Sequence, residues 1–357
     1  MFQIDDIANQ VLANCNIADS RHAGLYSICG LALRLRDLYK WENRLEPWVE
    51  NDPSDVLKWI GDKEEVWEKL AEKEFKDIFL FGRRFDPFDV KEINFILERY
   101  GLIYGGGYAR SLKPSFFLAA LEDKKEINHI TVFILGREFA RDLLTIPAFS
   151  QDNCIYVRKE SARLFLWDHI FYVKKSGRYA LKFALKNYGL KDGTPKNLHR
   201  NFYKIAADET ETYIYHELGE IRDGVFDRKT WQEIIAAFPH TPIELLARTV
   251  KDLLADTGQH GTLQHIIRER KTASLAFYVA FLESFTKVLF PQITEAFQTF
   301  TQKRDWELIE KSVTKGYDSA KSLAEAIIGI YRTGREKNDM KWVENEIAKR
   351  FKFCFHP

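Results

Sequence analysis

The segment Tyr215 to Glu220 reads YHELGE and combines a histidine with two carboxylates. If the segment is helical, His216 and Glu220 are four residues apart on one face, and Glu209 lies two turns earlier on the same face. An imidazole nitrogen and carboxylate oxygens suit zinc, iron or manganese, and the same groups can act as acid–base catalysts. The segment therefore predicts that Glu209, His216 and Glu220 bind one divalent transition metal (Zn, Fe or Mn) or transfer protons.

The same helix has a second interpretation. Its apolar stripe consists of Ile214, Leu218, Ile221 and Val225. At about 100° per residue, His216 and Glu220 lie opposite this stripe, which is typical of the solvent-facing side of any surface helix. The segment also lacks the second histidine of HExxH and the ExxH pairs of di-iron bundles. A solvated face is the commoner outcome of such a pattern, so both interpretations stay open.

Two further segments predict the binding of an anion. Arg137 and Glu138 follow Gly136 at the end of an apolar, β-branched run and are expected to open a helix, where free N–H groups and arginines can hold a phosphate or carboxylate. Three glycines, 105–107, are expected to form a loop that brings backbone close to a ligand. The expected binding residues are Tyr108, Lys113, Arg137, Glu138 and Arg141. Neither segment matches GxGxxG or a P-loop, and the alternative is a tight turn with a surface network of arginine and glutamate.

Other titratable residues carry weaker signals. His240, His260 and His265 lie near predicted turns, where a single histidine is more often a cap or a surface residue than a ligand. Glu283 interrupts a segment that is apolar nearly all round, and a buried carboxylate there requires a partner. The expected partners are Arg248, Arg268 or Lys287.

The composition is that of a globular protein. The chain has 357 residues, 45% hydrophobic and 29% charged, which fits two domains and argues against disorder. Its four cysteines are scattered and form no CxxC pair, so we expect neither a zinc framework nor a disulfide scaffold. The N-terminal segment FQIDDIANQ is acidic rather than apolar, and the stretch 272–282 is too short to cross a membrane. We expect a cytoplasmic protein without a membrane partner.

Charge is distributed unevenly along the chain. Residues 158–204 carry twelve basic and three acidic side chains, whereas residues 205–225 carry one basic and six acidic. Aromatic residues are interleaved with the basic ones, as on surfaces that bind nucleic acid. Their helical spacing favours a role in the core instead, and the net charge of the whole chain is only +1. Nucleic-acid binding is therefore the less favoured interpretation of this segment.

Hydrophobic periodicity predicts an α+β fold that is mainly helical. We expect helices near 22–41, 54–75 and 89–100, two short strands or an extended turn at 78–88, and a small α/β unit at about 129–175. In that unit, strands at 129–136 and 154–157 are each followed by a helix. Beyond residue 196 the pattern is helical only, at 197–222, 228–238, 243–255, 262–290, 304–315, 318–333 and 340–351. The turn-rich stretch 189–195 separates an N-terminal α+β domain (1–190) with a small sheet from a helical domain (196–357).

Several motifs resemble an uncharacterised bacterial family of unknown function. These motifs are SICGLALRLRDLYKWE with EPW, FDPFD, GLIYGGGY with KPSFFLA, GREFARDL and YHELGE. Together they span residues 21–220. The resemblance implies that these segments belong to one type of protein, and it implies no activity or catalytic residue.

The sequence thus predicts a metal-dependent enzyme that acts on a small anionic molecule at a polar site between the two domains. Two alternatives remain. One is a non-enzymatic protein that uses the segment 158–204 to bind nucleic acid or an acidic protein. The other is a structural or assembly protein. Whether the chain forms oligomers is not predicted.

Overall fold

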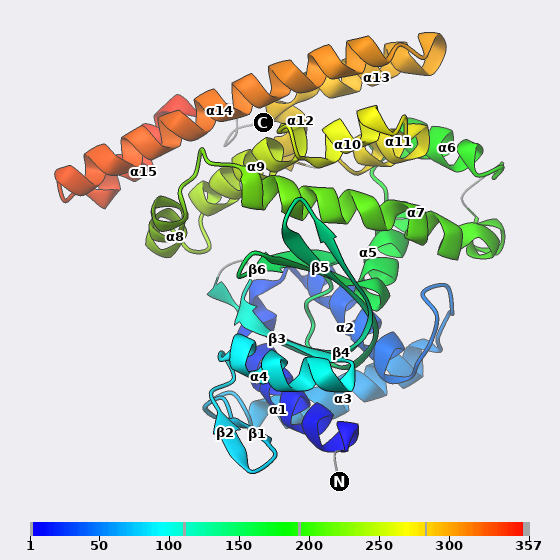
Figure 1. Cartoon of the computed structure of the whole chain (residues 1–357), viewed down its shortest axis with the longest axis vertical. Helices are drawn as coiled ribbons and strands as arrows, with labels where there is room; N and C mark the ends of the chain where they lie inside the picture. Colours follow the sequence, from blue (N-terminus) through cyan, green and yellow to red (C-terminus); the bar gives the residue numbers. More distant parts are fainter. Residues whose placement is uncertain (1–2, 110–111, 192–193, 283, 353–357) are drawn as a thin grey trace. The chain divides into compact units, whose positions relative to one another are not determined.

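The computed structural model describes residues 3–109, 112–191, 194–282 and 284–352. The chain forms two compact units, Met1–Trp167 and Asp168–Pro357, and the division falls inside helix α5 (Lys159–Phe171) (Figure 1). The first unit combines a sheet with helices, and the second is built from helices. The α+β, mainly helical fold predicted from the sequence is therefore confirmed. Glu283 lies outside the described residues, so its predicted pairing is not addressed.

A five-stranded sheet forms the centre of the first unit. Its strands are β3 (Leu102–Tyr108), β4 (Pro114–Ile127), β5 (Ile130–Arg141), β7 (Cys154–Arg158) and β6 (Ala148–Gln151), in that spatial order. Neighbouring strands are antiparallel except for β5 and β7, which run parallel with Val132 opposite Ile155. Strands β1 (Ile78–Leu80) and β2 (Arg83–Phe85) form a separate hairpin, as predicted.

The helix predicted to start at Arg137 is wrong, because β5 continues through Arg137 and Glu138 to Arg141. There it pairs with Phe117 of β4. The helix predicted between the two strands of the α/β unit at about 129–175 is wrong for the same reason, since β5 leads to β7 through β6. The second predicted strand and the helix after it are present as β7 and α5. Apolar residues in this stretch fit both the helical and the strand period, and pairing with a strand distant in sequence decides between them.

The three glycines predicted to form a ligand-binding loop lie within β3. A Cβ atom on Gly105 would lie 1.8 Å from the ring of Phe117, and one on Gly106 would lie 2.5 Å from the carbonyl oxygen of Pro87. The loop prediction is therefore wrong. Glycine is required here because an aromatic ring and a neighbouring carbonyl approach the strand closely.

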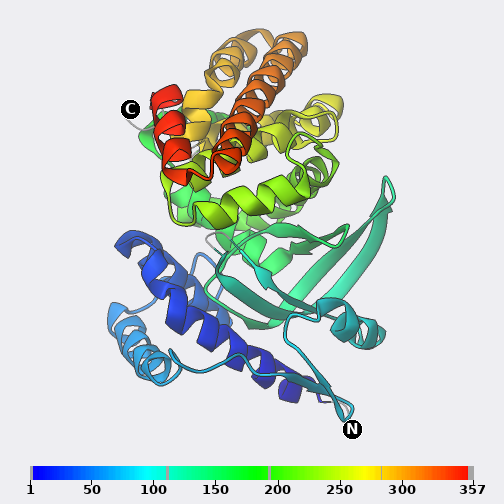
Figure 2. The same ribbon diagram turned by 90° about the vertical axis from the view of Figure 1, so that its left-hand side faces the viewer.

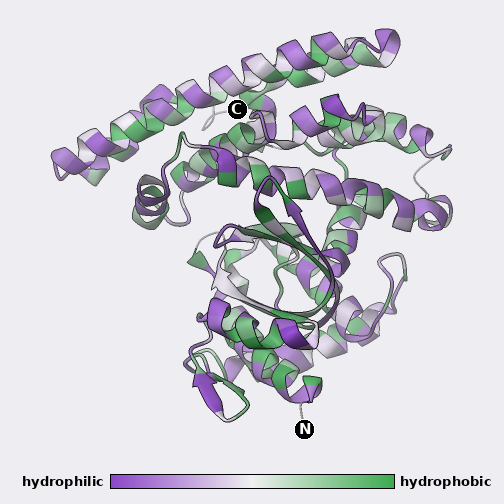
Figure 3. Ribbon diagram, viewed as in Figure 1, coloured by the Kyte–Doolittle hydropathy of each residue, from purple (hydrophilic) through white to green (hydrophobic). Residues whose placement is uncertain are grey.

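Helices flank the sheet of the first unit. They are α1 (Ile4–His22), α2 (Ile28–Glu42), α3 (Pro53–Glu68) and α4 (Val90–Leu97), with 3₁₀ helices at Ala23–Leu25 and Glu98–Tyr100. Helix α1 packs along β4 and β5 (Figure 2). Val11 and Cys15, one turn apart on α1, join Phe116 and Leu118 of β4 in one buried cluster. The polar far end of the β4–β5 hairpin is largely exposed (Figure 3).

The second unit is a helical bundle in its described part. After a 3₁₀ helix at Lys175–Gly177 it contains α6 (Arg178–Asn187), α7 (Pro195–Arg222), α8 (Arg228–Ala237), α9 (Pro242–Thr257), α10 (Thr262–Arg268), α11 (Thr272–Phe281), α12 (Ser284–Leu289), α13 (Pro291–Lys303), α14 (Trp306–Glu336) and α15 (Met340–Arg350). Across the described residues, no helix combines the length and the apolar character that crossing a membrane requires.

Three features of the bundle differ from those predicted, and the first is helix α13, for which no helix was expected. The stretch 304–333, expected as two helices, is the single helix α14. Its internal Gly316 is buried, and a Cβ atom there would lie 2.4 Å from the ring of Phe290. This glycine therefore permits close packing and does not end the helix. The stretch 262–290 is divided into α10, α11 and α12.

Candidate functional site

Helices α7 and α9 pack directly against each other (Figure 1). Their close approach depends on Gly219, the glycine of YHELGE, because a Cβ atom there would lie 2.2 Å from the carbonyl oxygen of Ala255. Helix α9 is fixed at its start by Thr241, whose hydroxyl accepts a hydrogen bond from the Glu244 N–H. Asp256 and Asp252 of α9 are thereby brought opposite the polar face of α7.

His216 is held between carboxylates of the two helices. Its Nδ1 lies 2.8 Å from Oδ1 of Asp256, and its Nε2 lies 3.9 Å from Oε1 of Glu220. Asp252 completes the group, since one ligand atom from each of His216, Glu220 and Asp252 lies within 4.8 Å of the others. We call these three residues the α7–α9 cluster. Lys251 forms an ion pair with the second oxygen of Glu220.

The face of α7 that carries His216 is covered to a large extent. The side chains of His216 and Glu220 keep 30% and 22% of their exposure, and Asp256 keeps 15%. The interpretation of this face as the open, solvated side of a surface helix is therefore wrong, because α9 packs against it. A metal shared by the two helices requires an acidic group of α9 within reach of His216, and Asp252 meets this requirement.

Charges in the cluster shift several pKa values. Burial lowers the pKa of His216, but Asp256, and then Glu217 and Glu220, outweigh this and raise it well above its usual range. The pKa of Glu220 is lowered because Lys251 and His216 together outweigh its desolvation. Asp252 is exposed at the rim, yet desolvation by the surrounding protein, together with Glu220 and Asp256, raises its pKa to about 6.

This arrangement has the form of a site for a metal or for a shared proton. Asp256 orients the imidazole through Nδ1 and directs Nε2 toward Glu220, which is the geometry of a carboxylate–histidine–metal arrangement. Three protein ligands leave a coordination position open, as in catalytic rather than structural metal sites. Without a metal, a proton on Nε2 balances part of the negative charge.

Glu209 does not belong to this cluster. It is buried, and it accepts a 2.6 Å hydrogen bond from the Ser274 hydroxyl. Seven residues of helix separate it from His216, which corresponds to about 10 Å along the axis. Desolvation raises the pKa of Glu209 to about 7. The structure thus brings together two of the three residues predicted as ligands and places the third elsewhere in the bundle.

His265 and His240 have partners other than the α7–α9 cluster. The ring of His265 stacks on Tyr215, with 3.8 Å between centroids, and its Nε2 lies 3.2 Å from Glu211. The backbone N–H of His240 donates to Glu244 near the start of α9. No second cluster of this kind occurs among the residues that the structure describes.

Three of the residues predicted to bind an anion are committed to ion pairs inside the first unit. Lys113 is buried and forms a 2.8 Å ion pair with Asp19. Arg141 is buried beside Glu138, which binds Arg158 through both oxygens at 2.9 and 3.0 Å. Although burial opposes it, the pKa of Glu138 is lowered because the two arginines stabilise its charge. These groups hold the core together and leave no charge free for a ligand.

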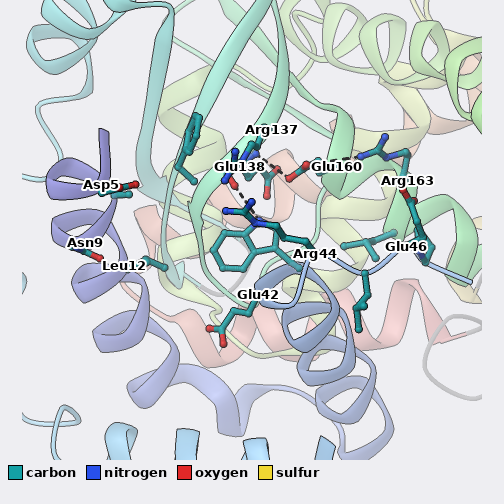
Figure 4. Close-up of a pocket in the computed structure, with 16 residues that line it drawn as sticks. Asp5, Asn9, Leu12, Glu42, Arg44, Glu46, Arg137, Glu138, Glu160 and Arg163 are labelled. Atoms are coloured by element: carbon teal, nitrogen blue, oxygen red, sulfur yellow. Dashed lines mark hydrogen bonds and ion pairs between the residues drawn. The ribbon is translucent and has the colours of Figure 1, made fainter. Parts of the chain in front are cut away.

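The other two predicted residues are exposed. Tyr108 is 64% exposed and stacks on Phe88. The guanidinium of Arg137 lies 5.0 Å from the centre of the Phe139 ring, and Arg137 helps to line a cavity of about 660 Å³ within the first unit (Figure 4). Of the five predicted residues, Arg137 and Glu138 line this cavity, whereas Tyr108, Lys113 and Arg141 do not.

Part of the basic segment 158–204 serves the fold. Arg158 is buried against Glu138, and Trp167 is buried. The expectation that its aromatic residues belong to the core is wrong for Phe171, Tyr172 and Tyr179, which are 43%, 55% and 59% exposed.

The sequence interpretation missed Asp252, Asp256 and Arg44. The two aspartates are four residues apart, which places them on one face of α9, and this spacing is a signal that the sequence contains. Their proximity to His216 depends on helix packing, which local spacing does not specify. Arg44 follows α2 with a left-handed φ of +54°, a conformation that usually holds glycine.

Family models match the two parts of the chain separately. The N-terminal domain of a family of unknown function, DUF6866, matches residues 6–158, and the C-terminal domain of that family matches residues 163–350. No curated protein and no solved structure matches the chain. The family resemblance inferred from the motifs at 21–220 is thus confirmed. The chain belongs to the family of unknown function DUF6866.

Proposed function

We propose that the α7–α9 cluster binds a divalent transition metal and that the protein is a metal-dependent enzyme. The observation that carries the proposal is the position of His216, whose Nδ1 contacts Asp256 while Nε2 lies toward Glu220, with Asp252 in the same group. Nitrogen and carboxylate ligands of this kind suit zinc, iron or manganese.

The charge of the site favours a divalent cation. Glu220, Asp252 and Asp256 contribute three negative charges, and Lys251 contributes one positive charge. With a neutral imidazole, these five side chains sum to −2, which a divalent ion neutralises. The raised pKa of His216 reports the same excess of negative charge, since Asp256, Glu217 and Glu220 favour its protonated form.

Each side chain has a defined task in this proposal. Asp256 accepts the Nδ1–H of His216 and so fixes the tautomer whose Nε2 lone pair is available. Glu220 and Asp252 supply oxygen ligands, and Lys251 limits the repulsion between them. These residues would hold the metal, and its chemistry there would be Lewis-acid activation of water for hydrolysis of a small anionic substrate. Binding releases the His216 proton, so affinity should rise with pH.

The first test is calorimetric titration of the full chain at pH 8 with Zn²⁺ and Mn²⁺. We expect one ion per chain, and we expect His216→Ala to weaken binding more than 100-fold. His265→Ala is the control, because His265 is buried and paired with a carboxylate but lies outside the cluster. Asp256→Asn should weaken binding by about 10- to 100-fold through loss of orientation. Equal affinity in wild type and His216→Ala, or no binding by wild type, would refute the site.

The second test addresses the enzymatic part. Hydrolysis of p-nitrophenyl phosphate, a small anionic ester, is measured with and without the metal that binds. The expected result is turnover that depends on the metal and is lost in His216→Ala but kept in His265→Ala. Turnover that persists in His216→Ala would show that the cluster does not catalyse the reaction.

A further inference from the structure

The cavity in the first unit has the size of a small-molecule site. Its volume of about 660 Å³ falls within the usual range of about 300 to 1,000 Å³ for ligand pockets. Helices α1, α2 and α5 and strand β5 contribute to its walls. In Figure 4, Asp5 and Asn9 lie on one side and Arg163 on the other, with Arg44 and Arg137 between them.

Arg44 occupies a position where local structure favours glycine. At the end of α2, the Leu45 N–H donates to the Lys40 carbonyl and the Arg44 N–H donates to the Trp41 carbonyl, which defines a Schellman motif. Arg44 has φ +54°, in the left-handed region. A residue with a Cβ atom is less stable there than glycine. This position holds an arginine instead of a glycine, and its side chain lines the cavity.

Arg137 reaches the same cavity through an irregularity in β5. Pairing with β4 shifts between Leu135 and Glu138, so Arg137 falls at a bulge. Bulges change the direction of a side chain relative to a regular strand. Arg137 lies over the Phe139 ring, and both residues line the cavity. The ring of Phe139 and the indole of Trp41 give the wall a flat apolar part.

The carboxylates of the wall are largely engaged elsewhere. Glu42 binds Lys63 and the Trp59 indole N–H. Glu160 accepts the backbone N–H of Glu138. By contrast, the guanidinium groups of Arg44 and Arg137 make no hydrogen bond or ion pair within the described parts of the chain. Asp5 and Glu46 also line the cavity, so its positive charge is confined to the part of the wall where Arg44 and Arg137 lie.

We propose that this cavity binds a small organic anion with a flat apolar body. Arg44 and Arg137 bind the carboxylate, phosphate or sulfonate group, since guanidinium groups form charge-assisted hydrogen bonds with such oxygens. Trp41 and Phe139 contact the flat body through their rings. The site is separate from the α7–α9 cluster and does not depend on a metal.

Fluorescence titration of the full chain with anilinonaphthalene sulfonate, in the presence of EDTA, tests the proposal. This probe joins a sulfonate to flat rings, and its uncharged relative phenylnaphthylamine tests the body alone. We expect the sulfonate to bind at least 10-fold more tightly than the uncharged compound. Inorganic phosphate should displace the sulfonate probe if contacts of the acidic group dominate the binding of that probe. Equal binding of the two probes would overturn the assignment of an anion site.

Variants locate the binding within the molecule. Arg44→Gly and Arg137→Gln should each weaken sulfonate binding by about 10- to 100-fold, since a hydrogen bond to a charged group contributes about 1.5 to 3 kcal/mol. Arg44→Gly should also fold at least as stably as wild type, which separates binding from folding. Arg99→Gln is the control, because Arg99 also lies over an aromatic ring, that of Phe95, but outside the cavity. Affinities unchanged in both cavity variants would refute the site, whatever the metal titration shows.

Discussion

Glu209 shows how burial changes the chemistry of one carboxyl group. Removal from water raises its pKa to about 7, although the Ser274 hydroxyl and Lys271 favour the charged form. Its neighbour Glu211, two residues away, has a lowered pKa because Lys271 binds it at 2.7 Å. The two carboxylates of one helix therefore depend on pH in opposite directions.

The consequence for stability follows from the sign of each shift. The folded state binds the Glu209 proton more tightly than the unfolded state does, so this stabilisation is complete below about pH 4.5 and is lost as pH rises through about 7. We expect Glu209→Gln to remove this trend. The free energy of unfolding of wild type, relative to the variant, should fall by about 3 kcal/mol between pH 4.5 and pH 8.

Urea unfolding at a series of pH values measures the difference. Glu211→Gln is the control, because the charge on Glu211 stabilises the fold above its unfolded pKa and this stabilisation is lost as pH falls through the lowered folded value. If the difference between wild type and Glu209→Gln did not change with pH, the titration of Glu209 would not contribute to stability.

Among the secondary-structure elements, the contact of α7 with α9 determines whether the candidate metal site exists. Gly219 permits the approach, since any larger residue would collide with the backbone of Ala255. Gly329 of α14 offers a contrast, because it is exposed and a Cβ atom there would meet nothing within 4 Å.

We therefore predict opposite effects for the same substitution at the two glycines. Gly219→Ala should destabilise the protein by about 1 to 3 kcal/mol, as overpacking does. It should also weaken metal binding, because α7 and α9 move apart and separate the residues of the cluster. Gly329→Ala should stabilise by about 0.5 to 1 kcal/mol, the usual advantage of alanine over glycine in a helix. Denaturant midpoints and metal titrations of both variants check this. A Gly219→Ala variant with wild-type stability and affinity would contradict the packing argument.

The sequence predicted elements well where local signals agree. Pro53 marks the start of α3 and Asp227 caps α8, and Gly101 has the left-handed φ of +68° expected of a residue that ends a helix. The prediction from sequence was wrong for β5 beyond Gly136, because pairing with β4 overrides an ambiguous apolar pattern. For the cluster, His216 and Glu220 were visible as a pair four residues apart. Asp252 and Asp256 come from a helix whose position depends on tertiary packing.

At the scale of the whole molecule, each of the two units has its own buried residues. Chains with several compact units commonly unfold in more than one step. We expect calorimetry of the full chain to show two transitions, because Met1–Trp167 and Asp168–Pro357 are separately compact.

Ligands should identify the two transitions. A ligand that binds only the folded form raises stability by about 2.7 kcal/mol at 100 times its dissociation constant. Metal should therefore raise the transition of the second unit, and anilinonaphthalene sulfonate that of the first. A single transition that both ligands raise together would show that the chain unfolds as one cooperative body.

The buried thiol of Cys15 can be used to measure how fast the first unit opens. It donates a 3.2 Å hydrogen bond to the Phe116 carbonyl, and burial together with Asp142 and Asp19 raises its pKa well above the usual range. Both effects suppress the reactive thiolate. Cys29 is exposed and Cys154 is partly buried. Once the other three cysteines of the chain, Cys29, Cys154 and Cys354, are replaced by serine, the rate at which Cys15 reacts measures how often α1 opens from the sheet, in a chain that carries no introduced label.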